Sequence, residues 1–186
     1  MRIICIGDSL TEGYVTKNSK RYYPYSTTLK SMLGRGVDVH NVGLSGRTTH
    51  QILQHLKTIS ISNYDIAIVL AGTNDLLNKT NQFILQKIKS VHIYCLAQGI
   101  HDVYALSLPQ IYGTRPLRET KRLRLNDRIR SWCNSKQSVK YIPFGETFLY
   151  HPESKLWAHN GYHLSVRGYK EMGRFIYHSF TRKRIP

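Results

Sequence analysis

Two short stretches at opposite ends of the chain carry side chains that could react together. Near the start, GDSL at 7–10 follows a short apolar run, and near the end HNGYHLS at 159–165 contains His163. A serine at a tight strand-to-helix turn can present its hydroxyl, and a neutral histidine within reach could take its proton. An ordinary turn with Ser9 as a helix N-cap would explain the first stretch equally well. The two stretches indicate nucleophilic catalysis if the fold brings Ser9 and His163 together.

Two further stretches offer hydrogen-bond donors. NVGLSG at 41–46 contains Gly43, whose backbone N–H could be left open to a ligand, and AGTND at 71–75 contains Asn74, whose amide could project from a turn. Together with the backbone N–H of Ser9, these donors suit the oxyanion that forms when a hydroxyl attacks a carbonyl. Taken singly, Gly43 could simply make a turn, and Asn74 lies among typical turn residues.

The elements that must position these side chains follow from the apolar pattern. Short apolar runs alternate with segments of helical spacing, and the run IAIVL at 66–70 has the continuous apolar character of a strand covered on both faces. This alternation predicts a doubly wound parallel sheet, in which chemistry gathers beyond the carboxyl ends of the strands. The expected strands are 3–6, 37–42, 66–70, 103–108 and 139–144, and the expected helices are 22–33, 48–59, 80–98, 117–133 and 165–180.

Length and composition place limits on the class of protein. With 186 residues the chain is long enough for one core, so we expect a single domain over 1–186. Three widely spaced cysteines indicate neither a disulfide framework nor a zinc site. The apolar run at the N-terminus is too short for a signal peptide, and no stretch is long enough for a membrane span, so we expect a cytoplasmic protein.

The formal net charge of +16 is unusual, and the segment LRETKRLRLNDRIR at 117–130 is the most basic part of the chain. Such a charge could serve nucleic-acid binding, but we find no zinc-finger spacing, ribonucleoprotein motif or recognition helix. We favour a solvated helix face with Leu123 and Ile129 packed inward. A basic surface could also gather an anionic ester, such as a phospholipid or an acetylated acidic polysaccharide.

The four motif blocks, in this order and at this spacing, resemble the SGNH hydrolases, also called the GDSL esterase/lipase family. The resemblance spans nearly the whole chain, and the short length with LPQIYG at 108–113 is similar to the small bacterial branch of thioesterases, lysophospholipases and short-chain esterases. It implies Ser9 as nucleophile, Gly43 and Asn74 as oxyanion donors, and His163 as base. It also implies a flavodoxin-like three-layer α/β/α sandwich around a five-stranded parallel sheet, with no metal or organic cofactor.

The sequence departs from the family pattern at one position. The family's last block reads Asp-x-x-His, and the matching residue here is Asn160, three residues before His163. An asparagine carries no charge to stabilise the imidazolium, and its NH2 group can hold the ring in the wrong tautomer. The chain could be an engineered Asp-to-Asn variant, a natural enzyme that works through Ser9 and His163 alone, or a relative that has lost catalysis.

A substitute acid is not obvious, since Glu153 is nearby in sequence, while Asp75 is better placed to shape the Asn74 turn. We favour a slower dyad because nucleophile, base and oxyanion donors are all present. Side chains that flank the motifs, and that could line an acyl or alcohol pocket, are Tyr14, Ile111, Tyr112 and Trp157, although packing explains each of them as well.

The sequence therefore predicts a serine esterase that cleaves a carboxylic ester or thioester through an acyl-enzyme. Its substrate would be a small-molecule, lipid or carbohydrate ester. The alternatives are an impaired relative that binds an ester or glycan without turnover, and a basic nucleic-acid-binding module.

Overall fold

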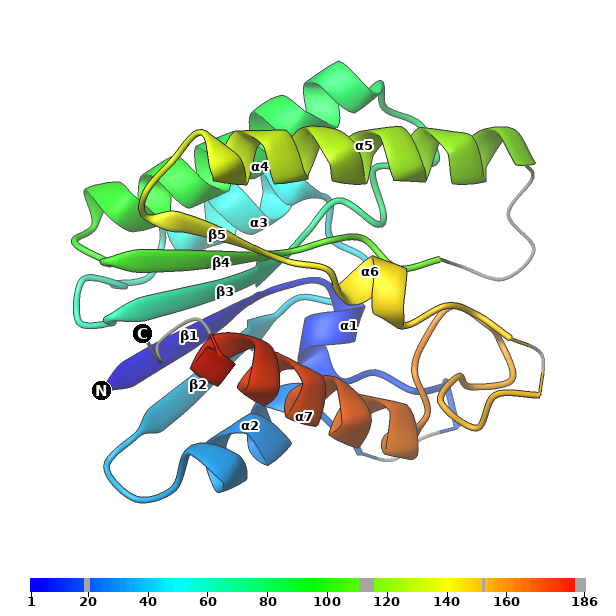
Figure 1. Ribbon diagram of the computed structural model, residues 1–186, viewed down its shortest axis with the longest axis horizontal. Coiled ribbons are helices and arrows are strands. Elements are labelled where there is room, and N and C mark those ends of the chain that lie inside the picture. The colour runs from blue at the N-terminus through cyan, green and yellow to red at the C-terminus, as the bar shows by residue number, and fades with distance from the viewer. Residues whose placement is uncertain (19–20, 111–115, 152, 183–186) are drawn as a thin grey trace.

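The computed structural model describes residues 1–18, 21–110, 116–151 and 153–182, and a parallel sheet forms its centre (Figure 1). The five strands lie in the order β2-β1-β3-β4-β5 and all pair in parallel. Their bounds are β1 (Arg2–Gly7), β2 (Asp38–Gly43), β3 (Ile66–Leu70), β4 (Asp102–Leu106) and β5 (Val139–Ile142). The strands β1, β2 and β3, whose ends carry the first three motif blocks, are neighbours.

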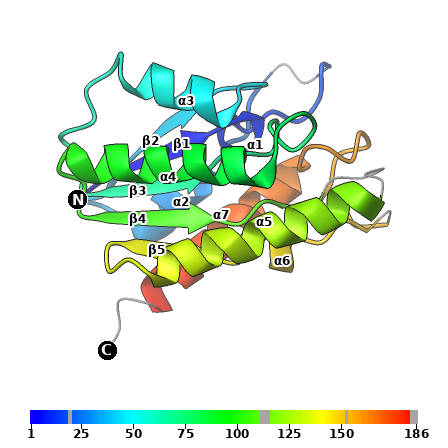
Figure 2. The ribbon, with the colours of Figure 1, turned by 90° about the horizontal axis from the view of Figure 1, so that it is seen from above.

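Helices cover both faces of the sheet and complete three layers. The helices α2 (Tyr25–Leu33) and α7 (Val166–Arg182) pack together on one face, and α3 (Thr49–Leu56), α4 (Asn81–Ala97) and α5 (Pro116–Asn134) follow one another across the other (Figure 2). Two short helices, α1 (Ser9–Glu12) and α6 (Phe144–Thr147), lie at the carboxyl ends of the strands. The predicted doubly wound α/β/α architecture is confirmed.

The central strands explain why the sheet is stable. All five residues of β3 are buried, as the run IAIVL predicts, and β1 is buried from Ile3 to Gly7. Strands covered by helices on both faces need such continuous apolar character, because neither side of the sheet meets water. Within the described part of the chain, no helix is both long and apolar enough to cross a membrane.

Two predicted strands are too long at their carboxyl ends. β5 ends at Ile142 because the next residue, Pro143, has no backbone N–H and is the N-cap of α6. β4 ends at Leu106, and the backbone N–H and C=O of Leu108 instead bond the side-chain amide of Asn126, both at 2.9 Å. The Ser107 N–H still donates to Ile142 of β5 at 3.0 Å, and from Leu108 the chain is held by α5.

The predicted inward face of α5 is wrong in part. Ile129 is buried as expected, but Leu123 is 46% exposed, and the charged Arg122 is buried in its place. Arg122 can be buried because its guanidinium bonds both carboxylate oxygens of Glu119, at 2.9 and 2.6 Å, and the Leu108 carbonyl oxygen at 2.6 Å. Part of the basic charge of this helix is therefore structural.

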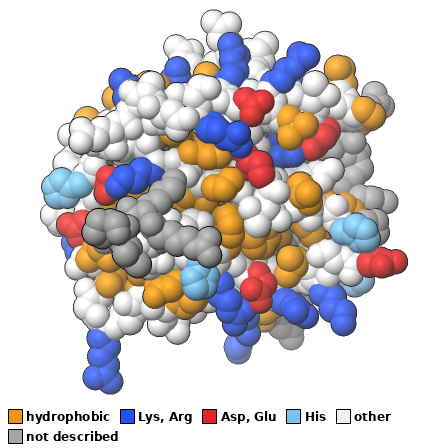
Figure 3. Space-filling view, in the orientation of Figure 1, with side chains coloured by type: hydrophobic (Ala, Val, Ile, Leu, Met, Phe, Trp, Pro, Cys, Tyr) orange, Lys and Arg blue, Asp and Glu red, His pale blue; other side chains and the backbone are white. Residues whose placement is uncertain are grey.

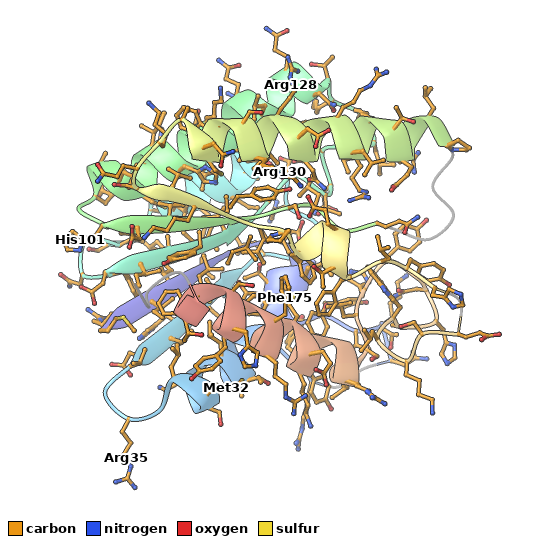
Figure 4. All side chains as sticks on the ribbon, viewed as in Figure 1. Met32, Arg35, His101, Arg128, Arg130 and Phe175 are labelled. Carbon is orange, nitrogen blue, oxygen red and sulfur yellow. The ribbon has the colours of Figure 1, made fainter. Side chains whose placement is uncertain are left out.

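The remaining basic side chains do not form one stripe on the face seen in Figure 3, where Lys and Arg are scattered among apolar and acidic side chains. Figure 4 shows Arg128 on the helical layer pointing away from the sheet, and His101 at the edge of the molecule where β4 begins. His101 is thus at the opposite end of the sheet from the carboxyl ends of the strands.

Candidate active site

The first strand leads directly into the turn that carries Ser9. Asp8 is the N-cap of α1, its Oδ1 accepting from the Leu10 N–H at 3.0 Å, so Ser9 is the first helical residue and not the cap. Gly7 is required there, since a Cβ atom would meet the Leu70 carbonyl oxygen at 2.3 Å. Burial raises the pKa of Asp8 to about 6. The hydroxyl of Ser9 is thereby free for another partner.

That partner is His163, whose Nε2 lies 3.0 Å from Ser9 Oγ. His163 comes from the loop before α7, which is pinned by a bridge between Trp157 and Leu164 and by a hydrogen bond from the Ala158 N–H to the His163 carbonyl. The Tyr14 ring packs edge-on against the imidazole, with ring centroids 4.8 Å apart. Burial lowers the pKa of His163, which favours the neutral ring that a general base requires.

Asn160 lies beside the other ring nitrogen, and its amide orientation is set by backbone groups. Its Oδ1 accepts from the N–H groups of Tyr162 and His163, at 2.9 and 3.1 Å, and its Nδ2 donates to the Val15 carbonyl at 3.2 Å. Exchanging oxygen and nitrogen would turn NH2 toward two donors and the amide oxygen toward a carbonyl. Hydrogen bonding therefore assigns Nδ2 as the atom that faces His163 Nδ1, 3.2 Å away.

This contact decides which tautomer of His163 is favoured. An NH2 group can only donate, so Nδ1 must accept, and the proton of the neutral ring then resides on Nε2. In that state Nε2–H donates to Ser9 Oγ and has no lone pair with which to take the serine proton. An aspartate would accept from Nδ1–H and leave Nε2 free. The contact of Asn160 with Nδ1 thus has the opposite hydrogen-bond polarity to the contact that an aspartate would make.

No other acid replaces it among the described residues. The buried Asp75 uses Oδ2 to hold the start of α3, accepting from the N–H and hydroxyl of Thr49 at 2.8 and 3.0 Å. Glu153 is exposed, and the only cause of the lowered pKa of His163 is burial, with no charged neighbour contributing. Asp75 was expected to shape the Asn74 turn, and its side chain instead ties that turn to the start of α3.

The two predicted side-strand donors lie near Ser9 but already have partners. Gly43 pairs with Gly7 in the sheet register, and its N–H donates to Asn41 Oδ1 at 2.9 Å. A Cβ atom at Gly43 would meet the Glu12 backbone nitrogen at 2.0 Å, so the close approach of α1 demands this glycine whatever its chemical role. Asn74 Nδ2 donates to the Arg47 carbonyl at 3.0 Å, which leaves one amide hydrogen for a ligand.

A cavity of about 150 Å³ opens beside the serine and histidine. Asn74 is among its lining residues, and the rest of the wall is largely apolar with charged side chains from α5. Beside Ser9, His163 and Asn74, the cavity is lined by Leu10, Thr73, Leu76, Leu77, Pro109, Arg118, Glu119, Arg122 and Tyr162. Sequence reasoning missed these side chains, although the apolar pair that follows GTND was a usable signal.

The four residues predicted to line a pocket have different positions in the structure. Tyr14 contacts the His163 ring, and the buried Trp157 donates its indole N–H to the Leu149 carbonyl at 3.1 Å, which makes it a packing residue. Ile111 and Tyr112 lie outside the described residues.

Comparison with known proteins adds the family. The model of the GDSL-like lipase/acylhydrolase family matches residues 5–171. The chain belongs to this family. A search of curated proteins found no match.

Solved structures of similar fold include a lipase/acylhydrolase from Enterococcus faecalis, with a TM-score of 0.79 and 20% identity over 98% of this chain and 96% of that one. A carbohydrate acetylesterase family member from Sinorhizobium meliloti has a TM-score of 0.77 and 19% identity over 96% of each chain. The M. smegmatis aryl esterase has a TM-score of 0.75 and 21% identity over 97% of this chain and 98% of that one. At these identities the likeness shows the fold.

The residues singled out in the sequence lie at the ends of β1, β2 and β3 and in the loop before α7. In that loop, Asn160 Nδ2 is the atom that faces His163 Nδ1.

Proposed function

We propose that this chain is a serine esterase that cleaves a carboxylic ester or thioester slowly, with Ser9 as nucleophile and His163 as base. The observation that carries the proposal is the 3.0 Å contact between Ser9 Oγ and His163 Nε2 at the wall of an apolar cavity. A hydroxyl and a neutral imidazole at this distance are the components of a general-base-assisted attack.

The reaction begins with the ring in its minor tautomer, which carries the proton on Nδ1. Nε2 then takes the Ser9 proton as Oγ attacks the carbonyl carbon, and His163 later returns it to the leaving alcohol or thiol. Reaching that tautomer sets Nδ1–H against the NH2 group of Asn160 and forfeits their hydrogen bond. In a serine protease the corresponding Asp-to-Asn exchange costs about 10⁴ in turnover. We therefore expect a weak esterase.

The oxyanion would be stabilised by the Ser9 N–H, the free hydrogen of the Asn74 amide and the Gly43 N–H. The Gly43 N–H donates to Asn41 Oδ1, so it can serve the oxyanion only when the ligand replaces Asn41 Oδ1 as its acceptor. Asn41 would stay in place during that exchange, because its Nδ2 donates to the Thr11 carbonyl at 2.6 Å. Asn74 is accordingly the donor best supported by its present contacts.

The cavity supports a small apolar acyl or aryl group. Its volume is similar to that of a cavity that holds a benzene ring, and Leu10, Leu76 and Leu77 contribute apolar surface. Arg118 lies on the same wall, and the net charge of +16 would speed the approach of anionic esters. Short acyl esters, including those of anionic alcohols, are thus the proposed substrate class.

The test is hydrolysis of p-nitrophenyl acetate and butyrate by the parent, Ser9→Ala and Asn160→Asp. We expect slow parental turnover that Ser9→Ala abolishes and Asn160→Asp raises at least tenfold, up to about 10⁴-fold. Turnover that needs Ser9 but ignores Asn160→Asp would show that the tautomer is not limiting. No Ser9-dependent turnover in either protein would refute the esterase proposal for these substrates.

A second candidate, an ester-binding protein without turnover, is favoured by the Nε2–H tautomer that the Asn160 contacts stabilise. Titration calorimetry with a non-hydrolysable ketone analogue of the butyrate ester would separate the two. Binding by a parent that lacks all turnover would support this alternative.

A further inference from the structure

Asn160 is followed by Gly161, and this is the only Asn–Gly pair among the nine asparagines of the sequence. Glycine leaves its own backbone nitrogen unshielded, so an asparagine side chain before it is open to attack by that nitrogen. Gly161 has φ of 63°, a conformation that other residues rarely adopt. The orienting amide of the active site therefore sits in the dipeptide most prone to losing its amide nitrogen.

We propose that Asn160 is a deamidation site, and that its conversion to aspartate activates the esterase by supplying the carboxylate that His163 lacks. The activation rests on the proposed function, whereas the chemical conversion does not. The modification would make the chain a slow-maturing enzyme whose active form carries a residue absent from its encoded sequence.

The conversion balances with water as the only co-reactant. The Gly161 nitrogen attacks Asn160 Cγ, the new C–N bond closes a succinimide, and the Cγ–Nδ2 bond breaks. Ammonia departs with the proton lost from the Gly161 nitrogen. Water then adds to the Cγ carbonyl and cleaves the bond to Gly161, so that the amide has become a carboxylic acid and the main chain is restored.

Contacts of the amide favour both halves of this exchange. The N–H groups of Tyr162 and His163 already donate to Oδ1, at 2.9 and 3.1 Å, and would stabilise the negative charge that this oxygen gains during attack. The departing atom, Nδ2, lies 3.2 Å from His163 Nδ1, which can donate a proton to it when the ring is in its minor tautomer with the proton on Nδ1. Asn160 is half-buried, so water can reach it.

One contact opposes the reaction and sets its pace. The Gly161 N–H donates to the Ala158 carbonyl at 2.9 Å, so this turn must open before the nitrogen can attack. The turn belongs to a loop outside the regular helices and strands, where local opening costs less than unfolding of the core. We therefore expect conversion on the time scale of storage rather than of turnover.

The loop also determines which product is useful. In aspartate, one oxygen can keep the hydrogen bonds from Tyr162 and His163, and the other can accept from His163 Nδ1–H, although it then faces the Val15 carbonyl. Hydrolysis at the other succinimide carbonyl gives isoaspartate, which adds a methylene to the main chain and displaces His163. We therefore expect the aspartate product, and not the isoaspartate product, to raise the esterase activity.

The test ages the purified full chain at mildly alkaline pH in water labelled with heavy oxygen. Peptide mass spectrometry measures the aspartate and isoaspartate fractions at position 160, and p-nitrophenyl butyrate hydrolysis is assayed on the same samples. We expect aspartate to accumulate at 160 faster than at Asn134, which precedes a serine, and activity to rise in proportion to it. Extrapolated to full conversion, activity should reach that of Asn160→Asp, at least tenfold above the start.

Two controls separate the parts of the inference. Aged Ser9→Ala should gain heavy oxygen at position 160 without gaining activity, and aged Asn160→Gln, whose longer side chain closes the ring poorly, should gain neither. A parent that keeps its amide while Asn160→Asp is active would overturn deamidation and leave the esterase proposal standing. Conversion to isoaspartate alone, conversion without activation, or an inactive Asn160→Asp would overturn the activation.

Discussion

The nucleophile turn, residues 7–12, and the base loop, residues 157–165, meet at the hydrogen bond between Ser9 and His163 but are held differently. The turn grows from a buried central strand, and its Thr11 carbonyl accepts from Asn41 on the neighbouring strand at 2.6 Å. The base loop is held by one bridge and a few turn hydrogen bonds. The sheet thus fixes where Ser9 lies, while the loop fixes the hydrogen bonds around its partner His163.

This difference means that the loop can vary without moving Ser9. Asn160 makes three hydrogen bonds to backbone groups within the loop and to Val15. Its contribution to the shape of the loop is therefore retained, and the change falls on the hydrogen-bond polarity toward His163.

The largest expected effects separate loop shape from polarity at position 160. Asn160→Asp should raise kcat by about 10- to 10⁴-fold, because Nδ1–H gains an acceptor and Nε2 is freed. Asn160→Ser, whose hydroxyl has two lone pairs and can accept from one backbone N–H group and from Nδ1–H, should raise it about 3- to 10-fold. The measurement is kcat for p-nitrophenyl butyrate across the three proteins. A serine variant slower than the parent would show that the amide supports catalysis.

The pH profile sharpens the same comparison. The base must be neutral, so the acid limb of kcat/KM reports the His163 pKa, which burial holds below 6.5 in the parent. A carboxylate in Asn160→Asp would stabilise the imidazolium and move that limb to higher pH. Both profiles would be measured from about pH 4 to 8. If the acid limbs of parent and Asn160→Asp coincide, the titration of another group controls the rate. The pH profile of Asp8→Asn would then show whether Asp8 is that group.

The same two regions show how much of this site could be predicted from the sequence. The ends of β1 and β3 were predictable because burial on both faces demands a continuous apolar run, and Ser9 and Asn74 follow shortly after those runs. The orientation of the Asn160 amide could not be predicted, because it depends on the Val15 carbonyl, which is distant in sequence. The burial of Arg122 was hidden for the same reason, because its partner Leu108 lies on a separate segment.

A smaller effect tests the buried nucleophile turn through its stability. Burial raises the pKa of Asp8 from 3.8 to about 6, so the folded state binds a proton that the unfolded chain releases. Between those pH values this group makes the folded state lose stability as pH rises, by roughly 2–3 kcal/mol in total. Asp8→Asn keeps a side-chain oxygen for the Leu10 N–H but removes the titration.

The check on Asp8 is urea unfolding of parent and Asp8→Asn at several pH values. The variant should gain stability relative to the parent as pH rises from about 4 to 7. The difference between the two proteins is the quantity to compare, because the buried His92, with its pKa lowered to about 3, acts on both in the opposite direction. A difference that stays constant with pH would contradict the raised pKa.

The smallest expected effect concerns Leu77, a cavity-lining residue that belongs to neither of the two regions. Leu77 lines the cavity and is 56% exposed, so Leu77→Ala should leave the fold intact and remove part of the apolar surface that holds an acyl chain. We expect kcat/KM for the butyrate ester to fall about 3- to 10-fold while that for the acetate ester changes less than twofold, since one or two methylenes are worth about 1–3 kcal/mol. Leu149→Ala, a matched exposed leucine outside the cavity lining, should change neither. Equal losses for both esters would place the acyl chain elsewhere and assign this wall to the alcohol portion.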